Sequence, residues 1–218
     1  MKLWQDGMCT ITMLTVGLTV GLAAGLSAAA PTRAQELTAT EKDRAVQYLE
    51  TTRKNILEAT RGLSDAQWNF KPAPDRWSIA QVMEHIATAE DFIRGNITDN
   101  VMKAPAPDMT GRDVKKIDDG VIAMLPDRSH KISAPEPLVP SNKYGTPAGS
   151  VAHFVESRAK TEAFVENTPG LRLHATDGPG PMGVKLDAYE WVLLIAGHSE
   201  RHLKQILEVK ADANYPKS

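Results

Sequence analysis

The chain has 218 residues and a formal net charge of −2, with 25 lysines and arginines against 27 aspartates and glutamates. This near-neutral balance excludes a broadly basic nucleic-acid-binding protein, so we expect no nucleic-acid partner. Cys9 is the single cysteine, which excludes a disulfide bond within the chain and a zinc site built from four cysteines. A metal site would therefore have to use histidines and carboxylates.

Residues 1–34 are typical of a secretory signal peptide. Lys2 precedes an uncharged apolar run, and small residues follow that run up to Ala34. We expect cleavage after Ala34, which leaves residues 35–218 as one mature domain that is periplasmic or secreted and has no contact with the membrane. The alternative is an uncleaved N-terminal anchor, because about 20 apolar residues suffice to span a bilayer.

Residues 38–62 form the first predicted helix, since apolar side chains recur along it at spacings of three and four. The connection that follows is rich in proline and tryptophan. Within it, Ser64 and Gln67 predict a capping box for one short turn of helix. Trp68 and Trp77 flank this turn, and we expect both to lock the connection onto the end of the domain.

Residues 78–102 form the second predicted helix, with Ser78 as its N-cap and prolines beyond its end. Residues 104–149 are the least regular part of the chain and contain one short predicted helix at 113–125. Loops of this length in a compact domain are often functional or disordered. We interpret this one as an ordered crossover on the surface of the domain.

Two further predicted helices cover residues 150–167 and 186–210, and no segment has a clear strand pattern. Four long amphipathic helices predict an all-α fold, a four-helix bundle. The short connection between the first two helices predicts that they are antiparallel neighbours. The long segment between the second and third helices can cross the bundle, so the order of helix directions stays open.

His198 and His202 lie four residues apart in the last predicted helix, so they share one face of it. That face is the apolar one, and Arg201 and Gln205 flank the pair. Two imidazoles at this spacing can ligate one metal ion. The pair alone is equally compatible with two packed histidines that are hydrogen-bonded to neighbouring residues.

His85 lies on the edge of the apolar face of the second predicted helix, one turn after Gln81. A neutral histidine inside a bundle needs hydrogen-bond partners, and on its own His85 is best interpreted as a satisfied residue at the core edge. Together with the pair it would provide three imidazoles and leave coordination positions open, as in a catalytic site. The remaining histidines are expected on the surface: His130, His153 and His174.

Three segments together resemble the DinB-like superfamily of metal-binding four-helix bundles. They are Leu63-Ser64-x-x-Gln67-Trp68 with Pro72 and Pro74, then Trp77-Ser78-Ile79-Ala80-Gln81-Val82-x-Glu84-His85-Ile86, and finally Gly197-His198-x-x-Arg201-His202-x-x-Gln205-Ile206. The resemblance covers about residues 38–210. It implies an up-down-down-up bundle with a long crossover between the second and third helices, and it implies that His85, His198 and His202 are metal ligands. Some members resemble thiol-dependent transferases or an isomerase, so membership implies a site rather than a substrate.

We therefore expect an exported metal-dependent enzyme. A divalent ion held by the three histidines lowers the pKa of a bound water, which creates a nucleophile near neutral pH. Hydrolysis of a small molecule is the default reaction, because water is the nucleophile available outside the cytosol. Zinc is the expected ion, and nickel or iron also suit three imidazoles.

Residues next to the predicted ligands are candidates for contacts that orient them or face a substrate. These candidates are Gln81, Arg201 and Gln205. For Arg201 a salt bridge with an acid on a neighbouring helix is equally compatible. Glu84 and Glu200 adjoin ligands in the sequence but project elsewhere on their helices, so no general base is identified.

Three other functions stay open. The first is a metal- or ligand-binding module without catalysis, which would have a closed site with a fourth protein ligand. The second is a thiol-dependent S-transferase, although the low-molecular-weight thiols of such enzymes are cytosolic. The third is a structural bundle in which the histidines only pack. The sequence also leaves open whether the protein forms a homodimer.

Overall fold

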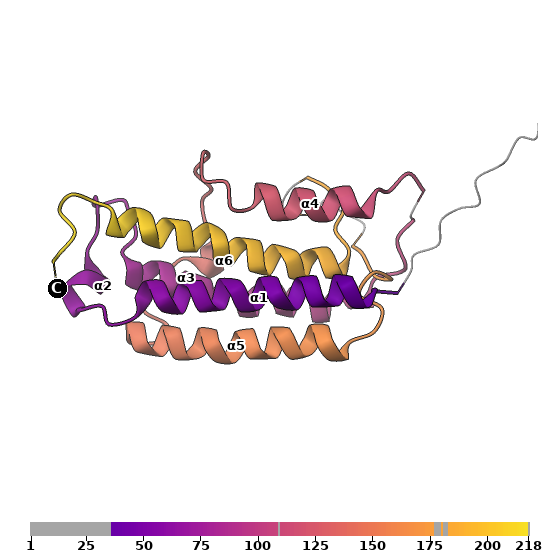
Figure 1. Ribbon diagram of the computed structural model, residues 1–218, viewed down its shortest axis with the longest axis horizontal. Coiled ribbons are helices and arrows are strands. Elements are labelled where there is room, and N and C mark those ends of the chain that lie inside the picture. The colour runs from indigo at the N-terminus through magenta and orange to yellow at the C-terminus, as the bar shows by residue number, and fades with distance from the viewer. Residues whose placement is uncertain (1–35, 109, 177–179, 181–182, 218) are drawn as a thin grey trace, which may run out of the picture. The chain divides into compact units, whose positions relative to one another are not determined.

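The structure is a computed structural model that describes residues 36–108, 110–176, 180 and 183–217. The predicted signal peptide lies outside these residues. Within them, four long helices pack into a bundle (Figure 1). The long helices are α1 (Ala39–Thr60), α3 (Ile79–Asp99), α5 (Pro147–Asn167) and α6 (Ala188–Lys210); the short ones are α2 (Asp65–Asn69), η1 (Val101–Lys103), α4 (Val114–Met124) and η2 (Glu136–Leu138).

Capping side chains fix where several helices begin. At α3, the Ser78 side chain accepts the Gln81 N–H at 3.3 Å, and the Gln81 side chain accepts the Ser78 N–H at 3.1 Å. This capping box satisfies two backbone donors that have no partner within the helix. The same arrangement is found at Thr38, Ser64 and Asp187. The five helices predicted from the sequence, and the short capped turn, are confirmed to within one helical turn at each end.

The long helices run up-down-down-up, as the resemblance implies. The starts of α1 and α6 lie together, because Tyr189 donates to the Glu41 carbonyl, and their ends lie together, because Lys210 donates to the Ala59 carbonyl. These two helices are therefore parallel neighbours. Helices α3 and α5 are parallel neighbours too, whereas α1 and α3 occupy opposite corners, with α3 behind α1 in Figure 1.

The prediction that the first two long helices are neighbours is therefore wrong, although they do run antiparallel. The connection between them contains α2 and is long enough to carry the chain across the end of the bundle to the opposite corner. A short connection limits the distance between two helix ends, and that distance still allows a diagonal placement.

The crossover, residues 104–146 without residue 109, returns the chain from one end of the bundle to the other. Its helix α4 packs against α6, and η2 packs against α3 (Figure 1). It is an ordered layer over one face of the bundle, as expected. In the described part of the chain, none of the helices combines the length and apolar composition that spanning a bilayer requires.

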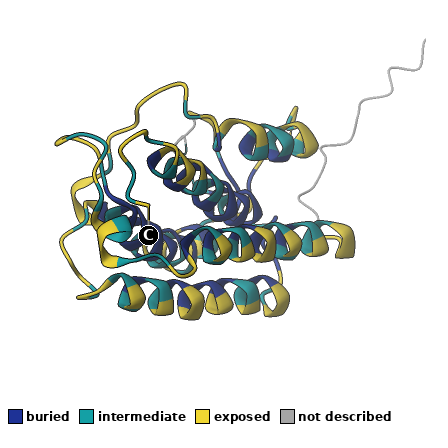
Figure 2. Cartoon of the chain, turned by 60° about the vertical axis from the view of Figure 1, so that its left-hand side comes forward, coloured by how far each residue is buried: buried dark blue, intermediate teal, exposed yellow. Residues whose placement is uncertain are grey.

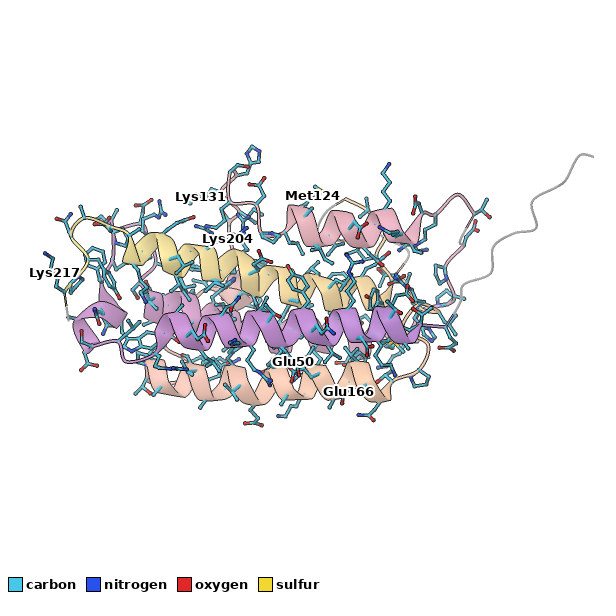
Figure 3. The ribbon with its side chains drawn as sticks, in the orientation of Figure 1. Glu50, Met124, Lys131, Glu166, Lys204 and Lys217 are labelled. Carbon is cyan, nitrogen blue, oxygen red and sulfur yellow. The ribbon has the colours of Figure 1, made fainter. Side chains whose placement is uncertain are left out.

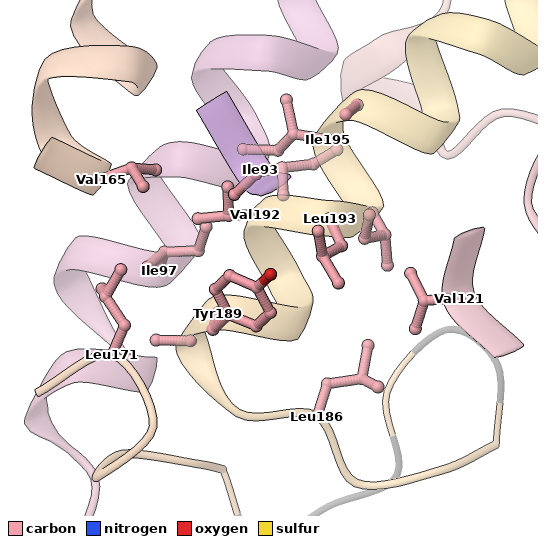
Figure 4. Close-up of a cluster of buried hydrophobic side chains, with 14 of the residues drawn as sticks. Ile93, Ile97, Val121, Val165, Leu171, Leu186, Tyr189, Val192, Leu193 and Ile195 are labelled. Carbon is pink, nitrogen blue, oxygen red and sulfur yellow. The ribbon is translucent and has the colours of Figure 1, made fainter. Parts of the chain in front are cut away.

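Apolar side chains fill the bundle as two clusters, one of which is shown in Figure 4. That cluster contains Ile97, Tyr189 and Leu193 near the start of α6, and the other contains Met83 and Phe154 near the start of α3 and α5. In Figure 2, the buried faces of the helices turn toward one another. Exposed charged side chains cover the outer faces, as the labelled residues of Figure 3 show: Glu50, Glu166 and Lys204.

Polar side chains interrupt this core at the middle of the bundle. The Arg158 guanidinium is fully buried and donates to both oxygens of Glu90, each at 2.8 Å, and to Ser199 at 2.7 Å. Charge-assisted bonds of this kind satisfy both ionised groups. This ion pair links α3, α5 and α6 in the same layer as the first histidine of α6.

Candidate metal centre

Three histidines converge between the antiparallel helices α3 and α6. His198 and His202 lie on one face of α6, and His85 faces them from α3. One ring nitrogen from each of the three lies within 4.8 Å of the others. The Nε2 atoms of His85 and His198 are 3.1 Å apart, and ring centroids are separated by 4.4 to 5.0 Å. The structure thus brings together the three histidines that the sequence singled out.

Two of the rings are oriented by hydrogen bonds at Nδ1. His85 Nδ1 donates to the Leu138 carbonyl at 2.8 Å, and His202 Nδ1 donates to Gln205 Oε1 at 2.8 Å. Because oxygen acceptors require the proton on Nδ1, Nε2 keeps its lone pair in both rings. In each ring Nε2 is then the nitrogen whose lone pair can bind a cation, and in His85 that lone pair accepts from His198 Nε2 in the metal-free protein.

All three imidazoles are neutral at neutral pH. Burial lowers the pKa of His198 to about 3, and the nearby His85 lowers it further. Burial also lowers the pKa of His85, and burial together with the other two rings lowers the pKa of His202. Neutral imidazole is the form that ligates metals, so these rings need not lose a proton when an ion binds.

The donor set fits a divalent ion. Bond lengths of about 2.0–2.1 Å from zinc to nitrogen place two tetrahedral ligands about 3.3 Å apart, which is close to the His85–His198 separation. Three neutral nitrogens occupy three coordination positions and leave at least one open. Because His85 and His202 carry their protons on Nδ1, at least two of the three Nε2 atoms have lone pairs that a cation can bind.

The three residues predicted to orient the ligands differ in what they do. Gln205 binds His202, and its Oε1 also accepts from Arg128 at 3.4 Å. Gln81 instead closes the capping box of α3. Among the described residues Arg201 makes neither of the two contacts considered for it, a ligand contact or a salt bridge with a neighbouring helix. Both of its terminal nitrogens donate instead to crossover carbonyls, those of Asp127 and His130.

The two glutamates beside the ligands point away from the cluster, as predicted. Glu200 accepts the hydroxyl of Tyr48 at 2.7 Å. Glu84 accepts three backbone N–H groups of the crossover, from Ser141, Asn142 and Lys143. No described carboxylate is hydrogen-bonded to any of the three rings. The site therefore contains metal-type ligands without an adjacent general base.

Sequence reasoning missed the contribution of the crossover to this site. The Leu138 carbonyl carries no side-chain signal, and it depends on a loop whose path the sequence leaves open. Trp77 was interpreted as part of a loop anchor, and its ring also lies against His85 with centroids 5.0 Å apart. An aromatic residue directly before the helix cap is the signal that could have indicated this contact.

The other histidines lie outside the cluster, and the prediction that all of them are surface residues is wrong for two. His130 is exposed, but His153 and His174 are half-buried. His153 bonds Asp91 and stacks on Tyr144, with ring centroids 4.4 Å apart. The cause is packing against the crossover, which also supplies the carbonyl that accepts from His174.

Comparisons with known proteins agree with this fold. The family model described as DinB superfamily matches residues 48–206, a stretch that contains the three histidines. The uncharacterised protein YuaE of Bacillus subtilis is 25% identical over 150 residues, which cover 69% of this chain and 87% of that protein.

Two solved structures share the fold at low sequence identity. YfiT from Bacillus subtilis, described as a probable metal-dependent hydrolase with an unusual four-helix bundle topology, is 15% identical with a TM-score of 0.51 and covers 83% of this chain and 91% of its own. A conserved protein from Enterococcus faecalis is 13% identical with a TM-score of 0.53 and covers 80% and 96%. At these identities the likeness shows the fold alone.

Proposed function

Since this chain belongs to the DinB superfamily, we propose that it binds one divalent ion through His85, His198 and His202 and hydrolyses a small-molecule substrate. The observation that carries the proposal is the convergence of three neutral imidazoles, two of which are fixed with Nε2 free. The description of YfiT as a probable metal-dependent hydrolase supports the reaction class. Because residues 1–34 are typical of a secretory signal peptide, the proposal includes activity outside the cytosol.

The chain's own residues would hold and orient the ion. The Leu138 carbonyl and Gln205 keep two imidazoles in the tautomer that ligates through Nε2. A bound divalent ion would supply Lewis acidity and lower the pKa of water at its open position. Three neutral nitrogen ligands leave the full positive charge of the ion uncompensated, so the site favours an anionic ligand. Zinc is the proposed ion, because open sites with three nitrogen ligands are typical of catalytic zinc.

Metal content tests the binding part of this proposal. The mature protein, purified without a histidine tag, should contain about one equivalent of metal per chain by elemental analysis. The His198→Ala variant should contain almost none, because two imidazoles on separate helices hold an ion far less tightly. If neither protein binds metal after incubation with zinc or nickel, the proposal is wrong.

Hydrolysis is tested separately with ester, amide and phosphoester substrates. Activity should follow metal content, disappear with a chelator and return with the added ion, and it should be absent in His198→Ala. One equivalent of bound metal with no hydrolysis of any substrate class would overturn the enzymatic part. The protein would then be a metal-binding module without catalysis.

A further inference from the structure

The residue that directly precedes two of the three histidines holds the crossover. Glu84 precedes His85, and Arg201 precedes His202. Consecutive side chains on a helix are about 100° apart, so these neighbours project sideways from the cluster rather than into it. Arg201 donates to the His130 carbonyl at 2.8 Å, and Glu84 accepts from the segment that follows η2. The crossover is thus fastened at both edges of the histidine cluster.

Glu84, on α3, makes an unusually large number of hydrogen bonds to the crossover loop. Its two oxygens accept the N–H groups of Ser141, Asn142 and Lys143 at 2.7, 3.0 and 2.9 Å. Asn142 adopts a left-handed conformation with φ of 66°, which turns successive N–H groups toward one point. The carboxylate is buried. A buried anion bound by three backbone donors fixes the loop strongly, because charge-assisted bonds exceed neutral ones in strength.

This loop is the one that orients His85. The carbonyl that accepts from His85 Nδ1 belongs to Leu138, the last residue of η2 and only three residues before Ser141. Between 139 and 143, the hydrogen bonds that join the described backbone to α3 all end on Glu84. The buried Leu138 side chain anchors this segment in the core, and the Glu84 carboxylate anchors the backbone that directly follows it.

We propose that Glu84 is the positioning residue of the His85 ligand. It fixes crossover residues 138–143, so that the Leu138 carbonyl holds the proton on His85 Nδ1 and Nε2 stays directed at His198. Without this carboxylate the carbonyl moves away, and the His85 ring exchanges tautomers and rotates. The role of His85 as a ligand rests on the proposed function, whereas its orientation by Glu84 is a property of the metal-free protein.

The first experiment observes the imidazoles directly. Nitrogen-15 NMR of the metal-free full chain should show His85 as a single tautomer with the proton on Nδ1. In Glu84→Ala the same ring should show averaged tautomers. Glu84→Gln should be intermediate, because its amide oxygen still accepts but its amide nitrogen faces a donor; this milder variant covers the case in which Glu84→Ala fails to fold.

Glu200→Gln is the matched control. It changes the same residue type next to a ligand, on the other helix, and it weakens a bond to Tyr48 instead of a bond to the crossover. Circular dichroism checks that each variant is folded. The His85 tautomer should be unchanged in Glu200→Gln, and zinc affinity measured by chelator competition should fall about 10- to 100-fold only in the Glu84 variants.

The outcomes separate the two proposals. A single, unchanged His85 tautomer in Glu84→Ala overturns the positioning role, and so does equal tautomer averaging in Glu200→Gln, which would indicate general loosening. Tautomer averaging confined to the Glu84 variants supports the role. If this averaging is seen and the parent protein binds no zinc, the positioning role stands while the proposed function fails.

Discussion

Two of the buried polar clusters that contact α6 are completed in different ways. The Arg172 cluster surrounds the start of α6 and pairs guanidinium groups with carboxylates. Its members are Glu41, Arg112, Asp118, Arg172, Asp187 and Glu190. The histidine cluster, at the middle of α6, contains three groups of one kind that are all neutral. The first is held together by ion pairs, although Arg112 Nε and Glu190 Oε1 have no hydrogen-bond partner among the described residues. The second brings together neutral ring nitrogens, with the Nε2 atoms of His85 and His198 3.1 Å apart.

This difference distinguishes buried polar groups that stabilise the fold from buried polar groups that indicate a bound ligand. In the Arg172 cluster, the arginine lies 2.6 Å from Asp118 and 2.7 Å from Glu41 and links α1, α4 and the start of α6. Four carboxylates against two arginines leave an excess of negative charge, and burial together with Asp187 raises the pKa of Glu190 to about 8. A proton bound to Glu190 reduces that excess by one charge. Under the proposed function, a metal cation has the corresponding role in the histidine cluster.

The largest effect should come from removing the central cation of the Arg172 cluster. Arg172→Met leaves several buried carboxylates without their main partner, so the free energy of unfolding should fall by about 3–5 kcal/mol. Urea denaturation at neutral pH measures this change. The exposed pair formed by Lys160 and Glu156 is the control, since Lys160→Met should cost less than about 1 kcal/mol. Equal losses of unfolding free energy in the two variants would show that burial does not determine how much these ion pairs stabilise the protein.

The second prediction concerns the stabilisation that the histidine cluster gains from an ion. Zinc at a hundredfold excess over its Kd should stabilise the protein by about 2.7 kcal/mol and raise the Tm by several degrees. His198→Ala should show almost no rise. Differential scanning calorimetry with and without zinc makes the measurement, and magnesium is the control ion because it prefers oxygen ligands. An equal rise in His198→Ala would locate the zinc elsewhere.

Much of this architecture could be predicted because it is local. Apolar periodicity predicted the long helices, and Ser78 as the N-cap predicted the start of α3. The spacing of His198 and His202 placed both on one face, since that relation depends only on helix geometry. The addition of His85 required the family resemblance, because no periodic signal relates side chains on two different helices.

The parts that escaped prediction depend on long-range packing. Gln81 and Gln205 look alike in the sequence as neighbours of histidines, yet one caps a helix and the other binds His202. The path of the crossover decides where Arg201 and the Leu138 carbonyl go. The diagonal placement of α1 and α3 likewise follows from how four helices pack together, which the length of one connection does not determine.

The third prediction tests whether the hydrogen bonds at Nδ1 contribute to the zinc affinity of the histidine cluster. Gln205→Ala removes the acceptor of His202 Nδ1 and frees the ring to rotate, so zinc affinity should fall about 10- to 100-fold. Chelator competition gives the affinity. Gln67→Ala is the control, because Gln67 closes a capping box at α2. An unchanged affinity in Gln205→Ala would mean that the ring is held by packing alone.

The smallest effect is a difference in pH dependence between the two clusters. The pKa of Glu190 is raised in the folded state, so its contribution is complete below the ordinary carboxyl pKa and is lost as pH rises toward 8. The pKa values of the histidines are lowered, so the metal-free fold loses stability as pH falls below about 6.5. Stability should therefore peak near pH 7, where the opposing slopes cancel, with slopes of up to about 1.4 kcal/mol per pH unit for each titrating group.

Glu190→Gln and His198→Gln assign the two slopes. Urea denaturation between pH 4 and 9, with a chelator present, should show that Glu190→Gln flattens the alkaline side, because the amide does not ionise. His198→Gln should reduce the slope on the acid side and leave the alkaline side unchanged. If Glu190→Gln instead flattened the acid side, Glu190 would be ionised in the folded protein. The Arg172 cluster would then hold its excess negative charge without a proton, and the contrast with the histidine cluster would disappear.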